Sequence, residues 1–352
     1  MHDGVMLRWT IRILLVVLLA AAIAVVSFWL LAQMREERSP VAAAGEGATF
    51  VTVDGLQMHY RQWGPSDGDP LLLVPGSMAW AETFRDIAAP LGNLGHRVIA
   101  IDLQPFGYSE RPADHDYSRA ASARRILGFA DALSLDEFSL GVHSYGGGAA
   151  LEAAFSAPDR IRSMVMLDVA LGLGRENGDG PPLARALSFG PLRDIAVSLT
   201  FANPLMIGKG LRDFIHDDRI VTDERIALYW KPMDVKGTTE AIGRWLFTGL
   251  YADERGSRAA DRANYKAFDK PVLVIWGRED TVTPLDQGEE IAAMLPRGRL
   301  KVLDGVNHIP HVEKPAEVTR LISDFLDGLD GKRDRLKIDG SLRGALIWNH
   351  SS

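Results

Sequence analysis

A serine, an aspartate and a histidine stand where they could carry out nucleophilic chemistry together. Ser144 follows the apolar run 138–142, Asp280 follows the run 271–276, and His308 follows the run 300–303. A serine hydroxyl is a poor nucleophile until a base takes its proton, and that base must itself be held by an acid. The three side chains, each on a loop after an expected strand, are therefore candidates for one catalytic site.

The segment around Ser144 predicts a sharp turn from a strand into a helix. The small residues from Gly146 to Ala150 allow the helix to approach the strand closely, and the turn directs the first N–H groups of the helix towards the serine oxygen. The pattern G-x-S-x-G is typical of such a turn, but Val142 stands where its first glycine belongs. A serine- and glycine-rich turn without catalytic function is the alternative interpretation.

The elements that must position these residues are strands alternating with helices. Residues 49–53 and 56–60 predict a hairpin around an Asp-Gly turn. Strands are predicted at residues 70–74, 97–102, 138–142, 161–168, 271–276 and 300–303, and the continuous apolar runs at 70–74, 97–102 and 271–276 predict strands buried on both faces. Helices are expected at residues 120–133, 285–295 and 316–329. This alternation predicts an α/β protein with a mostly parallel central sheet flanked by helices.

Residues 169–268 interrupt the alternation with short amphipathic segments separated by glycine and proline. Candidate helices lie near residues 183–189, 223–230 and 238–250, and we expect Trp230, Trp245, Phe247 and Tyr251 in their packed core. We interpret this block as a helical cap inserted between two strands and placed over one end of the sheet. The expected division is a core at residues 48–168 and 269–329, the cap at 169–268, and a C-terminal tail at 330–352.

Residues 13–34 form an apolar run long enough for a helix to cross the hydrocarbon core of a bilayer. We interpret residues 1–34 as a tail and transmembrane anchor and residues 35–47 as a linker, with a signal peptide cleaved near residues 42–44 as the alternative. Arginines flank both ends of the run, so the positive-inside rule barely separates the two orientations. The short N-terminal tail favours a single-pass membrane protein whose catalytic domain lies on the non-cytoplasmic side.

Composition excludes several other classes of function. The formal net charge is −7 and no basic stripe with interleaved aromatic residues occurs, so we expect no nucleic-acid partner. The chain has no cysteine, which excludes disulfides, thiolate metal sites and a cysteine nucleophile. Histidine and carboxylate spacings predict no metal site, no cofactor is expected, and the sequence makes no prediction of oligomeric state. The basic residues 332–337 are a solvated tail or a contact with anionic lipid.

Five blocks in the expected order resemble the α/β-hydrolase fold superfamily, with a helical cap between the sixth and seventh core strands. The blocks are residues 73–77, 102–109, 143–147, 277–284 and 307–315, and the resemblance covers residues 49–329. It implies that Ser144 is the nucleophile, that His308 is the general base and later the acid, and that Asp280 orients the imidazole. It also implies an oxyanion hole made by the backbone N–H groups of Ser77 and Tyr145.

Asp168 is a rival for the triad acid. It ends the strand before the one that leads to Asp280, and some members of the superfamily carry their acid there. Three other titratable residues have structural interpretations. We expect Asp102 to tie its loop to the sheet, His143 to be a packed residue of the turn, and His311 to stabilise the loop after His308.

A serine at the turn favours acyl transfer, because the epoxide hydrolases and haloalkane dehalogenases of this superfamily use an aspartate there. We therefore predict an enzyme, a serine hydrolase that cleaves a carboxylic ester of a small-molecule or lipid-like substrate through an acyl-enzyme. One alternative is a carbon–carbon bond hydrolase of the ring-cleavage type, which uses the same three residues and needs a polar cap residue such as Arg244 to hold a dienoate carboxylate. Another is a non-catalytic binding module that keeps the fold.

Overall fold

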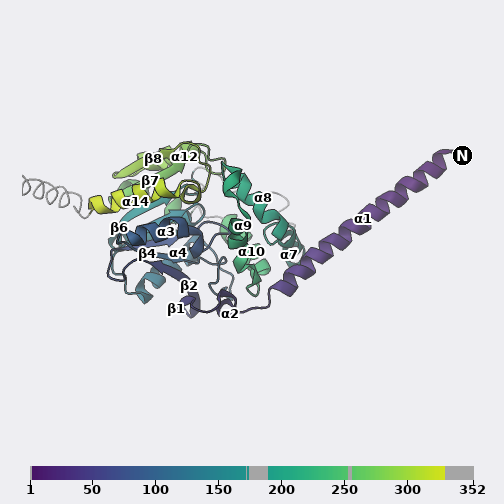
Figure 1. The fold of residues 1–352 in the computed structure, drawn as a ribbon, viewed down its shortest axis with the longest axis horizontal. Helices are drawn as coiled ribbons and strands as arrows, with labels where there is room; N and C mark the ends of the chain where they lie inside the picture. Colours follow the sequence, from purple (N-terminus) through teal and green to yellow (C-terminus); the bar gives the residue numbers. More distant parts are fainter. Residues whose placement is uncertain (1, 172, 174–188, 253–255, 330–352) are drawn as a thin grey trace, which may run out of the picture.

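The computed structural model describes residues 2–171, 173, 189–252 and 256–329. Within these residues an eight-stranded sheet is flanked by helices on both faces, and one long helix stands out from the side of the molecule (Figure 1). The α/β architecture predicted from alternating strands and helices is confirmed.

The sheet has the strand order β1-β2-β4-β3-β5-β6-β7-β8. β1 pairs with β2 and β2 with β4 in antiparallel fashion, while the other neighbours are parallel. The carboxyl ends of the parallel strands therefore meet at one edge, where their loops can bring side chains together. The strands are β1 (Thr49–Val53), β2 (Leu56–Trp63), β3 (Pro70–Val74), β4 (Arg97–Ile101), β5 (Phe138–His143), β6 (Ile161–Leu167), β7 (Val272–Gly277) and β8 (Gly298–Leu303).

Two layers of helices cover the sheet, and alternate residues of a strand pack into opposite layers. In β3, Leu72 and Val74 join the cluster under α4, α5 and α12, whereas Leu71 and Leu73 join the cluster under α3 and α14. This double burial explains why β3, β5, β6 and β7 are largely apolar, whereas β8 at the edge of the sheet alternates exposed and partly buried residues. The helices of the two layers are α3 (Arg85–Asn93), α4 (Arg119–Ala132), α5 (Gly146–Ser156), α12 (Leu285–Met294) and α14 (Pro315–Leu329).

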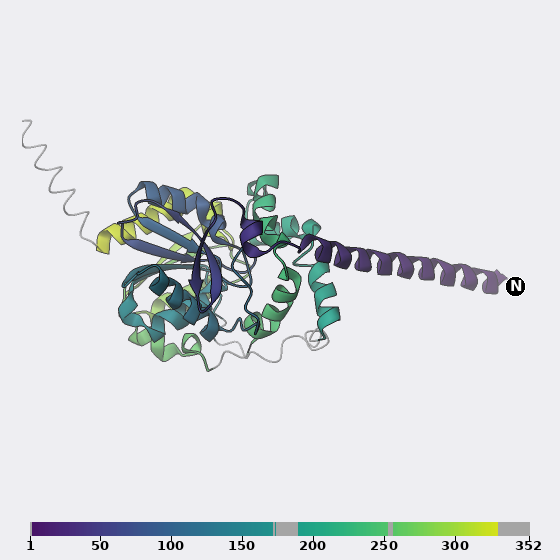
Figure 2. The same cartoon turned by 90° about the horizontal axis from the view of Figure 1, so that it is seen from below.

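Between β6 and β7 the chain forms short helices that lie over the end of the sheet where the parallel strands terminate (Figure 2). A buried cluster around Trp245, Ile242 and Phe106 joins them to the loops of the core. The cap helices are α7 (Gly190–Leu199), α8 (Pro204–Phe214), α9 (Asp223–Trp230) and α10 (Thr238–Trp245). The short elements are η1 (Ala81–Phe84), η2 (Pro158–Arg160), η3 (Asp218–Ile220), η4 (Lys231–Asp234), the π-turn η5 (Leu246–Leu250), η6 (Arg258–Ala260), α11 (Arg262–Ala267) and α13 (Pro310–Glu313).

The cap expectations have mixed outcomes. The helices expected near residues 223–230 and 238–250 are present as α9, α10 and η5. The helix expected near residues 183–189 lies almost entirely outside the described residues, and α7 and α8 were not predicted. Both helices have a proline in their first turn, a position that proline favours. In the sequence, proline is interpreted as a separator between segments, whereas here it marks the start of a helix. Tyr251, expected in the cap core, is 43% exposed, so that expectation is wrong.

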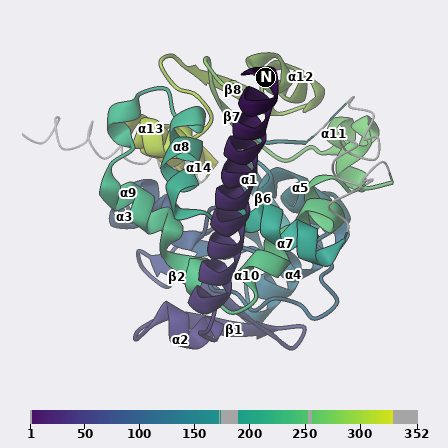
Figure 3. The ribbon, with the colours of Figure 1, turned by 90° about the vertical axis from the view of Figure 1, so that its right-hand side faces the viewer.

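The long N-terminal helix α1 (His2–Arg35) leaves the molecule on the side of the cap helices (Figure 3). By length and composition its stretch Arg8–Arg35 is a candidate membrane span. The segment expected as a linker contains a short helix, α2 (Pro40–Ala44), whose first turn is capped by the Ser39 side chain. The division into anchor, linker, core and cap stays a proposal, and the tail at 330–352 lies outside the described residues.

Candidate active site

The structure brings Ser144, His308 and Asp280 together at the carboxyl edge of the sheet. Ser144 Oγ lies 2.8 Å from His308 Nε2, and His308 Nδ1 lies 2.9 Å from Asp280 Oδ2. All three side chains are more than nine-tenths buried. With its Nδ1–H donated to the carboxylate, the imidazole presents the lone pair of Nε2 to the serine hydroxyl, which is the arrangement that allows it to accept the hydroxyl proton.

Ser144 stands on a strained turn between β5 and α5, with a φ of 50°. The following helix passes so close that side chains are excluded from its first turn: a Cβ on Gly146 would lie 2.4 Å from the Pro75 carbonyl oxygen, and one on Gly147 would lie 2.8 Å from Val169 Cβ. Val142, which departs from the usual glycine, is fully buried in the core cluster that also contains Ala149 of α5, so the fold accommodates the valine.

Asp280 is held as a carboxylate by the loop that carries it. Its Oδ1 accepts the backbone N–H groups of Val282 (2.7 Å) and Thr283 (2.9 Å), and its Oδ2 accepts the Thr283 hydroxyl at 2.6 Å. Burial alone would raise its pKa, but the hydrogen bond and charge of His308, with the other donors, lower the pKa of Asp280 to about 2. Asp280 is therefore a permanently charged partner for the imidazole.

Two buried histidines support His308, and both are neutral. His143 Nε2 donates to the His308 carbonyl oxygen at 2.8 Å, and the His143 and His311 rings are 4.7 Å apart at their centroids. Burial, followed by the charge of His308, lowers the pKa of His143 to about 3, and burial holds the pKa of His311 well below its usual value. With such low pKa values both rings are weak bases for the serine proton, which agrees with the structural roles expected for them.

The cap also holds the histidine loop, a contact that the sequence did not predict. The His308 N–H donates to the Phe214 carbonyl oxygen of α8 at 3.0 Å, and the two rings lie 5.6 Å apart at their centroids. Asn307 Nδ2 donates to the Asp213 carbonyl oxygen at 3.3 Å. Sequence reasoning offers no signal for this pairing, because the residues are 94 positions apart and the bonds use backbone atoms.

The two expected oxyanion donors lie beside the serine. Tyr145 follows it directly, and Ser77 follows Gly76, where an added Cβ would lie only 2.8 Å from Ser144 Cβ. The loop after β3 therefore passes against the serine with no room for a side chain. The Tyr145 ring turns towards the cap, where its centroid lies 5.2 Å from that of Trp245.

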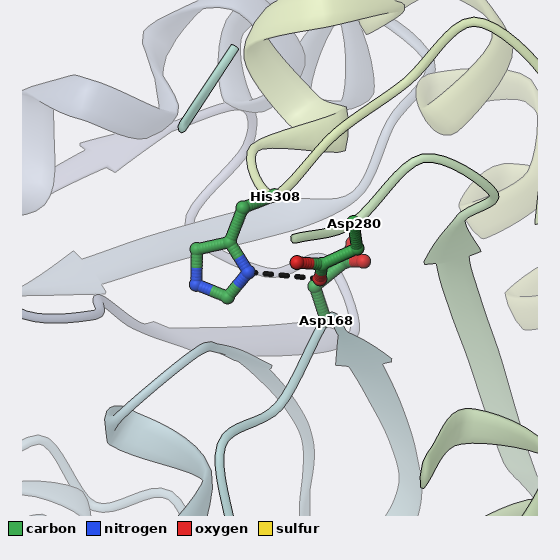
Figure 4. A group of neighbouring side chains, drawn as sticks. All are labelled: Asp168, Asp280 and His308. Carbon is green, nitrogen blue, oxygen red and sulfur yellow. Dashed lines mark hydrogen bonds and ion pairs between the residues drawn. The ribbon is translucent and has the colours of Figure 1, made fainter. Parts of the chain in front are cut away.

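Asp168, the rival acid, is fully buried next to Asp280 and does not bind the imidazole. Figure 4 shows its carboxyl group beside that of Asp280, with the hydrogen bond of His308 directed to Asp280. One oxygen of Asp168 accepts the Gly277 N–H at 2.8 Å. The ligand atoms of these three side chains lie within 4.8 Å of one another, and the hydrogen bond from His308 to Asp280 joins two of them.

Two further residues singled out from the sequence lie away from the serine. Asp102 accepts the backbone N–H groups of Ala81 (2.7 Å) and Tyr108 (2.6 Å) and contacts His59 Nδ1 at 2.8 Å, so it ties two loops to β2 as expected. Arg244 is 46% exposed and pairs with Glu240 at 3.4 Å on the surface of α10. The structure therefore gives Arg244 no place beside the proposed nucleophile.

The sheet order, the inserted cap and the serine turn define an α/β-hydrolase fold. The family model of the alpha/beta hydrolase family matches residues 71–321, and the chain belongs to that family. It is a hydrolase by this membership and by the relatives that it matches.

Among these relatives, the 2-hydroxymuconate semialdehyde hydrolase of Pseudomonas sp. (strain CF600) is 31% identical over 273 residues, covering 75% of this chain and 88% of that protein. A meta-cleavage product hydrolase from Pseudomonas fluorescens IP01 superposes with a TM-score of 0.63 at 24% identity, over 80% of this chain and 97% of that one. A bacterial membrane phospholipase A superposes with a TM-score of 0.60 at 22% identity, over 92% of this chain and 99% of that one. The two structures are evidence of the fold alone.

Proposed function

We propose that this hydrolase cleaves a carboxylic ester through an acyl-enzyme on Ser144. The observation that carries the proposal is the continuous hydrogen-bonded series from Ser144 Oγ through the His308 imidazole to Asp280. Such a series supplies a nucleophile, a base in the correct tautomer and a charge that stabilises the imidazolium. Each element is needed for acyl transfer, and a binding module would have no use for the buried charge.

In the proposed reaction, Ser144 Oγ attacks the ester carbonyl carbon while its proton passes to His308 Nε2. The resulting imidazolium donates Nδ1–H to Asp280 and then gives the Nε2 proton to the leaving alcohol oxygen, which leaves an acyl-serine. Water attacks that acyl group with His308 again as the base, and the carboxylic acid product leaves. The backbone N–H groups of Ser77 and Tyr145 stabilise the oxyanion of each tetrahedral intermediate, worth about 3 kcal/mol per donor.

Asp280 is the proposed triad acid, and Asp168 is not. His308 Nδ1 lies 2.9 Å from Asp280 Oδ2, and the neighbouring Thr283 hydroxyl donates to the same oxygen. Asp168 has a single backbone donor, the Gly277 N–H, and its carboxyl faces Asp280. A carboxyl with so few donors is a poor site for the negative charge that the imidazolium requires.

A carbon–carbon bond hydrolase is the second candidate, because the Pseudomonas sp. relative at 31% identity carries a name of that kind, 2-hydroxymuconate semialdehyde hydrolase. The same triad serves both reactions. The carbon–carbon hydrolase is expected to need a polar cap residue that holds the carboxylate of its substrate. Arg244, the candidate for that role, is exposed and paired with Glu240, which weighs against this reaction. Ester cleavage needs no such cation, and this difference favours the first candidate.

We propose that residues 1–34 are a retained membrane anchor. The residues that follow α1 are built into the cap: Glu36 is 9% exposed and accepts the Thr239 N–H at 3.0 Å, and Arg38 pairs with Asp234 at 3.0 Å. Cleavage near residues 42–44 would remove these partners from a folded domain. The superposition on the membrane phospholipase A covers 92% of this chain, a share that requires part of the segment before β1 to be matched. This coverage is consistent with a retained anchor.

The deciding experiment is labelling of the full chain in detergent with a fluorophosphonate probe, followed by a panel of p-nitrophenyl esters and a vinylogous diketone. We expect labelling of the wild type, none of Ser144→Ala, and turnover of esters. Loss of the diketone absorbance without ester turnover would select the carbon–carbon hydrolase. A folded wild type that takes up no probe would overturn both candidates.

A further inference from the structure

The last turns of α1 are packed against the cap. Val25, Phe28 and Trp29 are half-buried and Ala32 is 1% exposed, whereas their neighbours on the other side of the helix are exposed. These four positions lie three or four residues apart and share one face, which packs on α7. The part of the helix that would reach the membrane surface is therefore already in contact with the catalytic domain.

Residues 35–38, which we call the juxtamembrane segment, fix that contact. Arg35 Nε donates to the Met233 carbonyl oxygen at 2.8 Å, Arg35 Nη1 donates to the Ala202 carbonyl oxygen at 3.3 Å, and the guanidinium stacks 4.6 Å from the centre of the Trp230 ring. The Lys236 N–H donates to the Arg38 carbonyl oxygen at 2.8 Å. Because the last residue of α1 and a residue just after it both bind the cap, the end of α1 is fixed to the cap.

Large apolar side chains are exposed at the start of α7, which packs on α1, and at the start of α8. Phe189 and Leu192, at the start of α7, are 62% and 50% exposed. Leu205, in the first turn of α8, is 69% exposed and lies three residues after Ala202, which binds Arg35. We call the end of α1, the start of α7 and the first turn of α8 the cap edge. A soluble surface rarely gathers such residues without a partner.

We propose that the cap edge is seated in the near leaflet of the bilayer, with Phe189, Leu192 and Leu205 in the boundary between headgroups and acyl chains. The inference rests on the proposed anchor. If α1 spans the membrane, its packing on α7 leaves no length of chain to hold the cap away from the lipid, and the cap edge must meet the surface where α1 enters it. Aromatic and aliphatic side chains at that depth gain the free energy of apolar burial.

The absence of cysteine in the natural chain makes the test direct, because each introduced cysteine carries a unique label. Leu192→Cys and Leu205→Cys in the full chain would be labelled with an environment-sensitive fluorophore and placed in phosphatidylglycerol–phosphatidylethanolamine nanodiscs. Leu19→Cys in the exposed middle of α1 reports on the anchor, and Arg320→Cys, 61% exposed on α14, is the aqueous control.

We expect lipids with nitroxide on the acyl chain to quench the labels at 19, 192 and 205 and to spare the label at 320. Quenching at 19 alone would overturn the docking and leave the anchor intact. If none of the four labels is quenched, the anchor is overturned as well. Labels at 192 and 205 that are shielded from water yet not quenched by lipid would identify a second copy of the chain on the cap edge and overturn the bilayer as its occupant.

A separate observation concerns Asp168. Its side chain is completely buried at the end of β6, with Oδ1 bound to the Gly277 N–H, while Oδ2 has no donor directed at it from the described residues. The Asp168 carboxyl group lies beside that of Asp280, with an oxygen of each within 4.8 Å of the other. Two ionised carboxylates cannot share such a contact, so one of the two groups carries a proton.

The surroundings decide which group is protonated. Asp280 has two N–H donors, a hydroxyl donor and the His308 imidazole, whereas Asp168 has one N–H donor and faces the negative charges of Asp280 and Glu313. Burial, the hydrogen bond to Asp280 and the charge of Asp280 together raise the pKa of Asp168 well above its usual value. The proton therefore resides on Asp168.

We infer that Asp168 is a positioning residue that, as a neutral carboxyl, donates a hydrogen bond to Asp280 and holds that carboxylate against His308. It does not touch the reacting atoms. The inference rests on the proposed triad, because its effect is exerted through the imidazole. An amide can replace a neutral carboxyl, since an asparagine would accept from Gly277 through its oxygen and donate to Asp280 through its nitrogen.

The test compares Asp168→Asn with Asp168→Ala by the pH profile of probe labelling and of ester kcat/KM in the full chain. We expect the asparagine variant to keep the acid limb of the profile, and the alanine variant, which leaves Asp280 with one donor fewer, to move that limb upward and lower kcat. A fall of the limb in Asp168→Asn by about one pH unit or more would show that an ionised Asp168 had been removed, and would overturn the inference. An alanine variant with an unmoved limb would overturn it too, whereas failure of wild-type labelling would condemn the triad itself.

Discussion

Two buried carboxylates at the strand ends and a buried indole in the cap differ in how fully they are hydrogen-bonded. Asp102 and Asp280 are each met by two backbone N–H groups and by a histidine ring nitrogen. In the cap, Trp245 Nε1 is buried with no hydrogen-bond partner among the described residues. Leaving such a group unpaired costs about 1–3 kcal/mol.

This difference indicates which interactions hold each region in place. Parallel strands place their loops at one edge by backbone pairing, so the reactive groups there are held by many local bonds. The cap is held by a few contacts between distant segments, including the Phe214 carbonyl on the His308 N–H and the juxtamembrane segment on α10. We therefore expect core substitutions to act on chemistry or global stability, and cap substitutions to act on local packing.

The largest effect is expected at the nucleophile and its base. Ser144→Ala and His308→Ala should each lower ester kcat by about 10⁵–10⁶-fold, because the triad acts as a unit. Circular dichroism and thermal melts of the variants control for folding. Retention of more than a hundredth of the activity in either variant would contradict the assignment.

A smaller but still large effect is expected at the triad acid. Asp280→Asn keeps the shape of the site but reverses the direction of the hydrogen bond to His308 Nδ1, which puts a proton on the nitrogen that faces Ser144. We expect a loss of about 10⁴-fold in kcat. Asp168→Asn is the matched control and should keep most of the activity; a larger loss at 168 than at 280 would reassign the acid.

Leu72 and Leu205 compare the two regions through the same substitution. Leu72→Ala opens a cavity in the fully buried centre of β3, so we expect the free energy of unfolding to fall by about 2–5 kcal/mol. Leu205→Ala in detergent should change it by less than about 0.5 kcal/mol, because the side chain is exposed. Denaturant titration measures both. Equal losses would show that the cap edge is packed within the protein after all.

A pH-dependent effect is expected at Glu36. Burial raises the pKa of Glu36, so the folded chain keeps this proton over a pH range in which the unfolded chain has released it. The contribution of Glu36 to stability is therefore full below its usual pKa of about 4.5 and is lost as the pH rises through the raised value. As the pH rises above 4.5, the thermal stability of Glu36→Gln should increase relative to that of the wild type, by less than the loss at Leu72.

The smallest effect is expected at Arg244, and it bears on the second candidate function. Arg244→Ala removes an exposed ion pair, which contributes about 0–1 kcal/mol, so neither stability nor ester kcat/KM should change measurably. Turnover of the vinylogous diketone should be measured in the same variant. A specific loss of diketone turnover in this variant would return Arg244 to the substrate site.

Much of the core could be predicted from the sequence, because its determinants are local. Most of the parallel strands are largely apolar in sequence, and the reactive residues lie in the loops that follow β5, β7 and β8, so strand order was not needed to group Ser144, Asp280 and His308. The support of the site could not be predicted. The bond from His308 to the Phe214 carbonyl and the contact of Asp168 with Asp280 depend on how separate segments pack, and a backbone carbonyl carries no signature in residue type.

The juxtamembrane segment has a practical consequence for where this chain can be shortened. The sheet begins at Thr49, and a soluble fragment would ordinarily be designed to start shortly before it. Such a fragment would lack Glu36, and the N-terminus of α10 would lose the carboxylate that accepts the Thr239 N–H. A fragment that also keeps Ala32, which is 1% exposed, and the bonds of Arg35 to the cap must begin within α1, so that solubility and integrity of the catalytic domain demand different starting residues.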